Sequence, residues 1–498
     1  MLDQTAVPLL KTLQASAQRH HAPFYTPGHK GGQGVAQPLA DWWGKSVFQA
    51  DLPELPELDN LFTPTGVLQE AQQLAAEVFG AEKTWFLING STVGVMAAIL
   101  ATCGTGDKII LPRNIHQCAI AGLVHSGAMP VFVNPEYDPD TYLANSITPA
   151  GVAAALEQHP DAKAVMMVYP TYQGICGDIQ AIAQLAHQHN IPLLVDEAHG
   201  AHLAFHPELP TSALAAGADL AIQSTHKVLG AMTQASMLHL QGNRIDAQRL
   251  SQALQLLQSS SPSYLLLASL DAARQQMALY GEQLMNRTLQ LAAQARNQIS
   301  QMANLSVLEP ANTPGFRELD GTRLTVKVSD LGLTGFKVDQ IFHQQLGVTA
   351  ELPTFPNLTF IISLGNTQAD IEQLVLAFTK ITQDDYLSSI TGGLQDVFQK
   401  WSEQLLFIHP SSFIICPALS PREAFFAPTE TIAIEDTPDR ISAELICPYP
   451  PGIPALMPGE MINPATIEYL QQVLILGGEI TGCSDPSLRT LKVVKEKA

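Results

Sequence analysis

The sequence has little charge for its length, and few of its charged residues are basic. Only 14% of the 498 residues are Asp, Glu, Lys or Arg, and 26 basic residues stand against 46 acidic ones, which gives a formal net charge of −20. Nucleic-acid binding requires clustered Lys and Arg to neutralise phosphates, so this composition argues against it. An acidic protein attracts cationic small molecules instead, although the charge alone is weak support for such a substrate.

Long apolar runs and cysteine motifs are also missing. No run reaches the roughly 18–20 apolar residues that a membrane-spanning helix needs, and residues 1–21 lack the pattern of a secretion signal. The six cysteines show neither CxxC nor metal-ligand spacing. We therefore expect a cytoplasmic protein of two or three domains, with reduced and mostly buried thiols and no bound metal.

Seven short apolar stretches alternate with helical stretches in the first half of the chain. The apolar stretches are residues 84–88, 108–112, 129–133, 164–170, 192–199, 219–224 and 234–240, and helices are expected at 92–103, 150–158 and 178–189. Nearly continuous apolar strands suit a sheet covered on both faces, and strand–helix alternation predicts a doubly wound, mostly parallel α/β sheet of seven strands. Ligands bind beyond the carboxyl ends of such strands.

The second half of the chain predicts a smaller α/β unit and a further domain. A long helix is expected over about 262–302, followed by strands at 323–328 and 358–364 and helices near 336–346 and 368–382. A helix from about 385 leads into a Pro-rich segment, 448–460, which favours extended structure and turns. The predicted divisions are an N-terminal segment (1–50), a large domain (51–290), a small α/β domain (291–384) and a C-terminal α+β domain (385–498).

Lys227 and Asp196 each follow a predicted strand. Lys227 lies in QSTHK, and a partly desolvated lysine there becomes a nucleophile that can condense with an aldehyde. Taken alone, a solvated surface lysine is the commoner explanation. A buried carboxylate at Asp196 needs a cationic partner, and a protonated pyridine nitrogen is one, as in pyridoxal-phosphate enzymes. The alternative, an acid that binds Mg²⁺ beside a nucleotide, is weakened by the missing GxxxxGK[ST] loop.

Polar residues also follow two other strands. Asn89, Gly90, Ser91 and Thr92 lead from a strand into a helix, where backbone N–H groups and hydroxyls suit a phosphate; a plain helix cap is about as good an explanation. His116 follows the strand KIILP and could stack on a pyridine ring, although an isolated histidine is more often an ordinary polar contact. Together with the lysine and the acid, these residues predict a cofactor site.

The motifs resemble those of the Orn/Lys/Arg decarboxylases, a group of fold-type-I pyridoxal-phosphate enzymes. The similar stretches are TPGHKGG (26–32), 58–92, PRNIHQ (112–117), DEAHG (196–200), STHKVLGAMTQASMLHL (224–240), SSSPSYLLLASLD (259–271) and PYPPGIPALMPGEM (448–461). STHK followed by TQASMLH is highly specific, and the last segment separates this group from ordinary aminotransferases. The wing domain of the large enterobacterial-type relatives has no room before residue 26, so their decamer assembly and nucleotide regulation are not implied.

The resemblance implies a role for each matching residue. Lys227 would hold pyridoxal phosphate as a Schiff base, Asp196 would bind the ring nitrogen, and His116 would stack on the ring. His199 would lie near the phenolic oxygen. The phosphate would contact Gly90, Ser91, Thr92, Ser224 and His226, and Ser259 or Ser260 would reach the phosphate of the neighbouring subunit in a homodimer.

The implied reaction is decarboxylation of lysine, arginine or ornithine to cadaverine, agmatine or putrescine, with Lys227 or His226 returning a proton to Cα. Glu351 is a candidate for the distal cation of the substrate and Arg323 for its carboxylate, although a surface position is the commoner explanation for both. The alternatives are an aminotransferase or other amino-acid lyase on the same fold, which should need a firm arginine clamp, and a binding protein that has lost activity.

Overall fold

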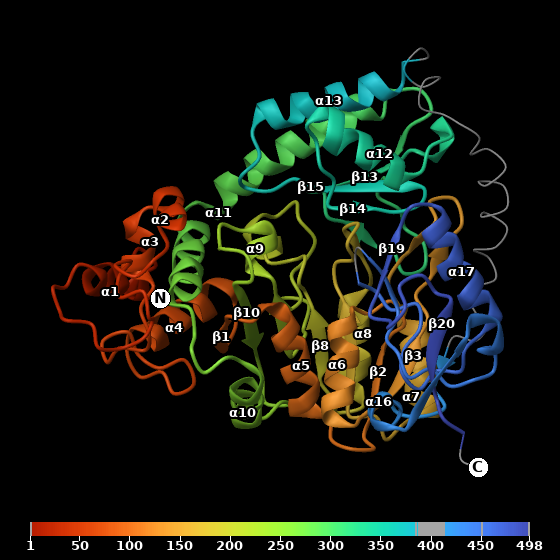
Figure 1. Cartoon of the computed structure of the whole chain (residues 1–498), viewed down its shortest axis with the longest axis horizontal. Helices are drawn as coiled ribbons and strands as arrows, with labels where there is room; N and C mark the ends of the chain where they lie inside the picture. Colours follow the sequence, from red (N-terminus) through yellow and green to blue (C-terminus); the bar gives the residue numbers. More distant parts are fainter. Residues whose placement is uncertain (1, 384–385, 387–413, 450–451, 497–498) are drawn as a thin grey trace. The chain divides into compact units, whose positions relative to one another are not determined.

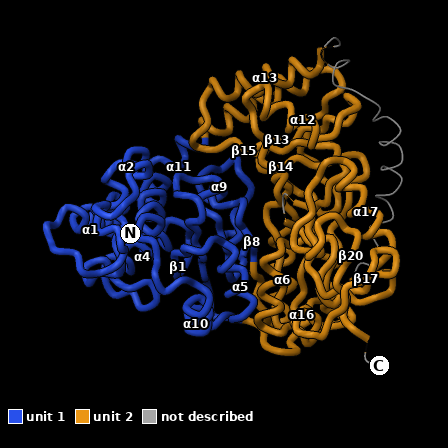
Figure 2. Tube along the Cα trace, viewed as in Figure 1, with its two compact units in different colours: residues 1–101, 195–285 blue, residues 102–194, 286–498 orange. Residues whose placement is uncertain are grey.

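The computed structural model describes residues 2–383, 386, 414–449 and 452–496 (Figure 1). The chain forms two compact units, the first made of residues 1–101 and 195–285 and the second of 102–194 and 286–498 (Figure 2). The two divisions after residues 194 and 285 fall inside a strand and a helix.

All seven predicted strands are present. They are β1 (Lys83–Leu87), β2 (Lys108–Pro112), β3 (Met129–Val133), β6 (Ala164–Val168), β8 (Leu193–Asp196), β9 (Leu220–Gln223) and β10 (Ser236–Leu240). In the first unit the order is β1-β10-β9-β8, with β10 antiparallel to β1 and β9. In the second it is β6-β2-β3-β16, with β2 parallel to β3 and β6. The eighth strand, β16 (Ile414–Ile415), pairs antiparallel with β3 and was not predicted.

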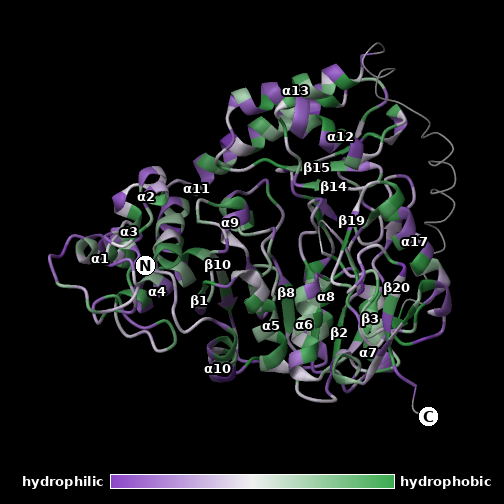
Figure 3. Ribbon diagram, viewed as in Figure 1, coloured by the Kyte–Doolittle hydropathy of each residue, from purple (hydrophilic) through white to green (hydrophobic). Residues whose placement is uncertain are grey.

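The strands are buried because their residues are apolar on both faces. Every residue of β8, β9 and β10 is buried, and Figure 3 shows the sheet strands mainly in the hydrophobic colour. The helix α4 (Val67–Phe79) precedes these strands, and the helices between them are α5 (Gly90–Thr102), α6 (Gln117–Ser126), α7 (Pro149–Gln158) and α8 (Ile179–Gln188). The pattern of the predicted helices is thereby confirmed.

Gly94 lets α5 lie unusually close to the strands of the first unit. A Cβ atom at this position would be 2.7 Å from Ile222 Cγ2 and 2.8 Å from Leu87 Cδ1, shorter than real contacts allow. Any other residue would push the helix away from β1 and β9. The close approach brings the first turn of α5 to the ends of these two strands.

The second unit also contains a small antiparallel sheet of order β11-β13-β15-β14. Its strands are β11 (Ser306–Val307), β13 (Arg323–Lys327), β14 (Leu352–Pro353) and β15 (Asn357–Ile361). They pack against α12 (Gly335–Ile341), a π-helical turn (Phe342–Leu346) and α13 (Gln368–Ile381), around an aliphatic and aromatic core. The predicted smaller α/β arrangement is present, and the long helix α11 (Tyr264–Ile299) precedes it.

The described C-terminal residues mix short helices and strands. They are α16 (Pro421–Phe426), β17 (Thr429–Ala433), β18 (Cys447–Tyr449), α17 (Pro464–Ile475), β19 (Glu479–Thr481) and β20 (Thr490–Val494). β17 pairs with β20 and β18 with β19, both antiparallel. The helix expected from about residue 385 lies outside the described residues.

The remaining short elements connect these parts. They are α1 (Pro8–Ala17), α2 (Gln37–Trp43), α3 (Lys45–Ala50), α9 (Thr225–Val228), α10 (Ala247–Leu257), β4 (Tyr137–Asp138), β5 (Leu143–Ala144), β7 (Ile175–Cys176) and β12 (Glu318–Leu319), with 3-10 turns at 203–205, 329–331 and 434–436. None of the helices in the described ranges has both the length and the hydropathy to cross a bilayer. All six cysteines are described, none is in a disulfide, and four are buried.

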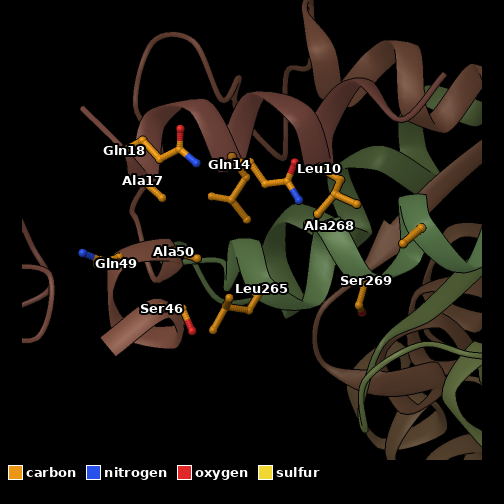
Figure 4. A pocket seen from close by; sticks show the side chains of 12 residues that line it. Leu10, Gln14, Ala17, Gln18, Ser46, Gln49, Ala50, Leu265, Ala268 and Ser269 are labelled. Carbon is orange, nitrogen blue, oxygen red and sulfur yellow. The ribbon is translucent and has the colours of Figure 1, made fainter. Parts of the chain in front are cut away.

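A buried ion pair in α11 holds the N-terminal helix in the first unit. Asp271 and Arg274 form the pair, and both side chains are fully buried. The Asp271 carboxylate accepts hydrogen bonds from the backbone N–H of Leu9 and Leu10, while Arg274 donates to the carbonyl of Ala6 at 2.7 Å. A groove of about 410 Å³ between α1, α3 and α11 lies beside this anchor (Figure 4).

Replacing Arg274 with alanine should destabilise the protein strongly. The change leaves the Asp271 carboxylate buried without its cation, a situation that costs about 3–5 kcal/mol. The matched control is Arg19→Ala, which breaks the Arg19–Glu57 pair, whose arginine side chain is 47% exposed; such pairs contribute about 0–1 kcal/mol. Urea unfolding followed by circular dichroism measures both. An equal decrease in the free energy of unfolding of the two variants would contradict the prediction.

Candidate cofactor site

Lys227 lies in a single helical turn directly after β9. Its backbone N–H donates to the Ser224 carbonyl, and the neighbouring His226 N–H donates to Ala235 O at 3.1 Å, so the turn is held on both sides. The Lys227 Nζ atom is 2.9 Å from Nε2 of His199, which is 3% exposed. The amine is therefore half-buried and aimed at a buried imidazole rather than at solvent.

Asp196 ends β8 and is buried. Its Oδ1 accepts a hydrogen bond from the Ala198 N–H at 3.2 Å. Burial raises the pKa of the Asp196 carboxyl, and the positive charge of Lys227 acts in the opposite direction. Because burial prevails, the ionised acid needs a further cationic partner. A protonated ring nitrogen supplies one, so this lysine and this acid fit pyridoxal phosphate.

Two hydroxyls meet at the start of α5. The Ser224 Oγ donates to Ser91 Oγ at 2.7 Å, which joins the ends of β9 and β1. Gly90 begins the helix with a φ of +77°, a conformation that glycine adopts without strain. Thr92, the residue after Ser91, is exposed. Hydroxyls beside the N–H groups of a first helical turn form a donor set that suits a phosphate.

Ser259 and Ser260 are both exposed in the segment between α10 and α11. The Ser259 N–H donates to Asn89 Oδ1 at 3.0 Å, directly before Gly90. Two further contacts fix this turn and were not predicted: Gln258 Oε1 accepts from the Ile88 N–H, and Gln234 donates to the Ile88 carbonyl. Gln234 lies within the motif 224–240 and Gln258 directly before the motif 259–271, but nothing in their local sequence indicated such distant partners.

His226 is half-buried beside Lys227. Burial lowers the pKa of the His226 imidazole, and the charge of Lys227 lowers it further. The imidazole is therefore uncharged near neutral pH, in the form that can accept a proton and give it back.

A buried hydrogen-bonded chain that the sequence did not predict crosses the strands of the first unit. The Glu197 carboxylate accepts from Gln223 Nε2 at 2.8 Å and from the Ala213 N–H at 2.7 Å. Gln223 Oε1 is 3.0 Å from His239 Nε2, and His239 Nδ1 is 2.8 Å from Thr84 Oγ1. Burial raises the pKa of Glu197 to about 7 and lowers that of His239 to about 3. The neutral His239 thus donates to Gln223 and accepts from Thr84.

The chain supports the two residues next to it in sequence. Glu197 follows Asp196, and Gln223 precedes Ser224, so the hydrogen bonds fix the backbone that carries the Asp196 carboxyl and the Ser224 hydroxyl. The only available sequence signal was a polar residue inside an otherwise apolar strand, at Gln223 and at His239.

His116 belongs to the second unit, where it caps α6. Its Nδ1 accepts a hydrogen bond from the Cys118 N–H at 3.2 Å. Its stacking role stays a prediction. The surface explanation for Arg323 was wrong, because this side chain at the start of β13 is 1% exposed and donates to Thr322 Oγ1 at 3.4 Å. Burial lowers the pKa of Arg323, and the charges of Asp320 and of the exposed Glu351 act in the opposite direction.

Comparison with known proteins identifies the family. A family model described as the Orn/Lys/Arg decarboxylase major domain matches residues 7–321, and a model of the C-terminal domain of the same family matches residues 403–483. The chain belongs to the Orn/Lys/Arg decarboxylase family. The resemblance drawn from its motifs is thereby confirmed.

Similar proteins cover the chain from end to end. An arginine decarboxylase of Bacillus subtilis (strain 168) is 39% identical over 100% of this chain and 99% of its own length, and one of Bacillus anthracis is 38% identical over 99% and 98%. The structure of lysine decarboxylase A from Pseudomonas aeruginosa superposes with a TM-score of 0.84 at 25% identity, covering 98% of this chain and 80% of that one. The Escherichia coli constitutive lysine decarboxylase, with a TM-score of 0.83 and 22% identity over 99% and 82%, shows the shared fold.

These findings confirm the predicted class of enzyme. This Orn/Lys/Arg decarboxylase has the α/β fold of fold-type-I pyridoxal-phosphate enzymes and uses that cofactor to decarboxylate a basic amino acid. The family assignment also argues against the alternative of an aminotransferase.

Proposed function

We propose that this decarboxylase acts on arginine and releases agmatine and CO2. Full-length relatives at 38–39% identity that are named arginine decarboxylases support this choice of substrate. The observation that carries the proposed catalytic centre is the pairing of Lys227 with His199 beside the buried Asp196.

In the proposed site, Lys227 holds pyridoxal phosphate covalently and Asp196 binds its ring nitrogen. His116 stacks on the ring and His199 lies near its phenolic oxygen. The phosphate contacts Gly90, Ser91, Thr92, Ser224 and His226, and Ser259 or Ser260 contacts the phosphate of a partner subunit. The hydroxyl contact between Ser91 and Ser224 and the exposed positions of Ser259 and Ser260 support this arrangement.

When bound, the cofactor supplies an electron sink for the pair released as the bond between Cα and the carboxylate breaks. The protein must hold that carboxylate perpendicular to the ring, an orientation effect that contributes several kcal/mol. Asp196 keeps a proton at the ring nitrogen. A proton returns to Cα from the protonated amine of Lys227, or from the His226 imidazole after it has taken up a proton, and the exposed Glu351 binds the distal guanidinium of the substrate.

We further propose a cytoplasmic homodimer with the domain boundaries predicted above, at residues 50, 290 and 384. The family models, which match 7–321 and 403–483, support a separate C-terminal domain. Large apolar side chains exposed in the first unit support a dimer surface, among them Phe24, Trp42 and Trp43.

Separate incubations of the purified enzyme with arginine, lysine and ornithine test the proposed substrate. We expect agmatine as the main product, with kcat/KM for arginine at least about tenfold above that for the other two, because a site matched to the planar guanidinium and its fork of donors discriminates against the compact ammonium groups of lysine and ornithine. The reaction contains pyridoxal phosphate and no keto acid, and both the amine and the CO2 are measured. Greater turnover of lysine or ornithine would overturn the choice of arginine, and a requirement for a keto acid would overturn decarboxylation itself.

A further inference from the structure

Arg113 ties the end of β2 to a segment about 340 residues later in the chain. Its guanidinium donates to the Pro454 carbonyl at 2.7 Å, to the Ala455 carbonyl at 3.0 Å and to Glu460 Oε2 at 3.0 Å. All of these residues lie in the second unit. Three charge-assisted hydrogen bonds from one fork define both the position and the direction of the segment, residues 452–460.

Glu460 is the acidic half of this anchor. It is 9% exposed, and the same Oε2 atom that pairs with Arg113 accepts a hydrogen bond from the Met457 N–H at 3.0 Å. The carboxylate thereby closes the C-terminal end of the segment 452–460 into a tight turn. Since both partners of the ion pair are mostly buried, loss of either one leaves the other uncompensated.

The other end of the segment lies against His116. The Gln117 N–H donates to the Gly452 carbonyl at 3.1 Å. Gly452 is buried and has a φ of +87°, and a Cβ atom there would be 3.0 Å from Gln117 Nε2 and 3.3 Å from His116 Nε2. A glycine is therefore the residue that lets the segment touch the imidazole edge without displacing it.

One nitrogen of the His116 imidazole accepts a hydrogen bond, and the other lies close to Gly452. Nδ1 accepts the Cys118 N–H, so in the neutral ring the proton is on Nε2, which faces Gly452. The α6 cap and the segment 452–460 thus limit rotation of the ring from opposite edges.

We propose that residues 452–460, anchored by Arg113 and Glu460, position His116 against the cofactor. The proposal rests on the proposed stacking role of His116. Arg113, Gly452 and Glu460 are positioning residues: they act through the imidazole and touch no reacting atom. A stacking group displaced by about 1 Å can cost up to about a hundredfold in rate, so a contact made far along the chain controls the chemistry.

The test is Gly452→Ala compared with Gly477→Ala. Both glycines have positive φ values, +87° and +90°, and both lie in the C-terminal part of the chain, but a Cβ atom at Gly477 has no neighbour within 4 Å. The two variants therefore share the same backbone strain, and only Gly452→Ala presses on His116. We expect Gly452→Ala to lower kcat about 10- to 100-fold with KM changed less than about threefold, and to alter the visible circular dichroism of the bound cofactor. Gly477→Ala should leave all three unchanged, and identical behaviour of the two variants would overturn the proposal.

Glu460→Gln tests the anchor without adding bulk. It retains the shape of the side chain and removes the charge that pairs with Arg113. The control is Glu430→Gln, which removes the charge from the Arg440–Glu430 pair elsewhere in the C-terminal residues. We expect the cofactor dichroism to change and its dissociation constant to rise, measured by titration of the apoenzyme, in Glu460→Gln alone. A change of equal size in Glu430→Gln would reduce the anchor to a general stabilising contact and overturn the proposal.

The variant His116→Ala distinguishes the stacking role of His116 from the positioning role of residues 452–460. Native dichroism and native cofactor affinity in His116→Ala would refute the stacking role itself. If His116→Ala is altered and Gly452→Ala is native, the stacking role stands and the positioning role falls. If Gly452 acts on the reaction through His116, adding Gly452→Ala to His116→Ala changes kcat by less than about twofold. A fully additive loss of kcat in the double variant would contradict the proposal.

Discussion

Replacing Lys227 with alanine should abolish decarboxylation and the visible absorbance of covalently bound cofactor. Covalent attachment of the cofactor depends on this amine in the proposed site, and the amine is also one of the two candidate proton donors to Cα; general acid–base catalysis alone contributes about a hundred- to ten-thousandfold. We expect kcat to fall at least about a thousandfold. Borohydride reduction followed by mass spectrometry of the intact chain should show a cofactor adduct in the native enzyme and none in the variant.

Two controls separate chemistry from charge. Lys227→Arg retains a cation near Asp196 but cannot form the covalent bond, so it should be as inactive as Lys227→Ala. Lys83→Ala removes a lysine of the same unit that lies 4.5 Å from the Trp85 ring centroid, with no proposed role in the site, and should retain activity. A normal holoenzyme spectrum in Lys227→Ala would refute the assignment.

The strands of the large sheet could be predicted because their apolar runs are local in the sequence. β9, for example, has four buried residues directly before the polar Ser224 and the turn that carries Lys227. β16 could not be predicted, because two consecutive isoleucines are too short a stretch to show the alternating pattern of a strand. Its partner β3 also lies about 280 residues away in the sequence. Local pattern fixes the existence of a strand, whereas its partner is chosen by tertiary contacts.

Arg323 shows how a distant residue can reverse an expectation. An arginine at the start of a strand is usually exposed. Here Gly174, with a φ of +88°, leaves the space that the side chain occupies: a Cβ atom at Gly174 would be 2.7 Å from Arg323 Cγ. The residue that decides this burial lies about 150 positions away, and nothing in the strand itself indicates it.

The site was more predictable than its support. Lys227, Asp196 and Ser91 each follow a strand, so the topology that brings strand ends together could be inferred from their order alone. The hydrogen-bonded chain from Glu197 through Gln223 and His239 could not, because Gln223 and His239 lie on different strands and Glu197 directly follows a third. Sequence order identifies the residues beside a ligand better than the residues that hold them in place.

Replacing Asp196 with asparagine should disable the enzyme while leaving it folded. The amide has the same shape and can accept a hydrogen bond, but it carries no negative charge to keep a proton on the ring nitrogen. The electron sink is weakened at the point where charge develops, an electrostatic loss of about a thousandfold in kcat. Cofactor affinity should also fall. Asp196→Glu keeps the negative charge on a side chain that is one methylene longer, and it should therefore retain part of the kcat and part of the cofactor affinity.

The matched control is Asp219→Asn. Asp219 is a second buried acid of the same unit, 2% exposed, and it pairs with Arg244 at 3.0 Å at the beginning of β9, the opposite end of the strand from Ser224. Loss of its charge should lower the melting temperature because Arg244 loses its partner, yet leave kcat and the cofactor spectrum near native. Asp196→Asn should show the reverse: a small change in melting temperature of the apoenzyme and a large change in kcat. Because burial already disfavours the charge of Asp196, loss of that charge should destabilise the folded apoenzyme little. Native kcat in Asp196→Asn would show that this acid does not bind the ring nitrogen.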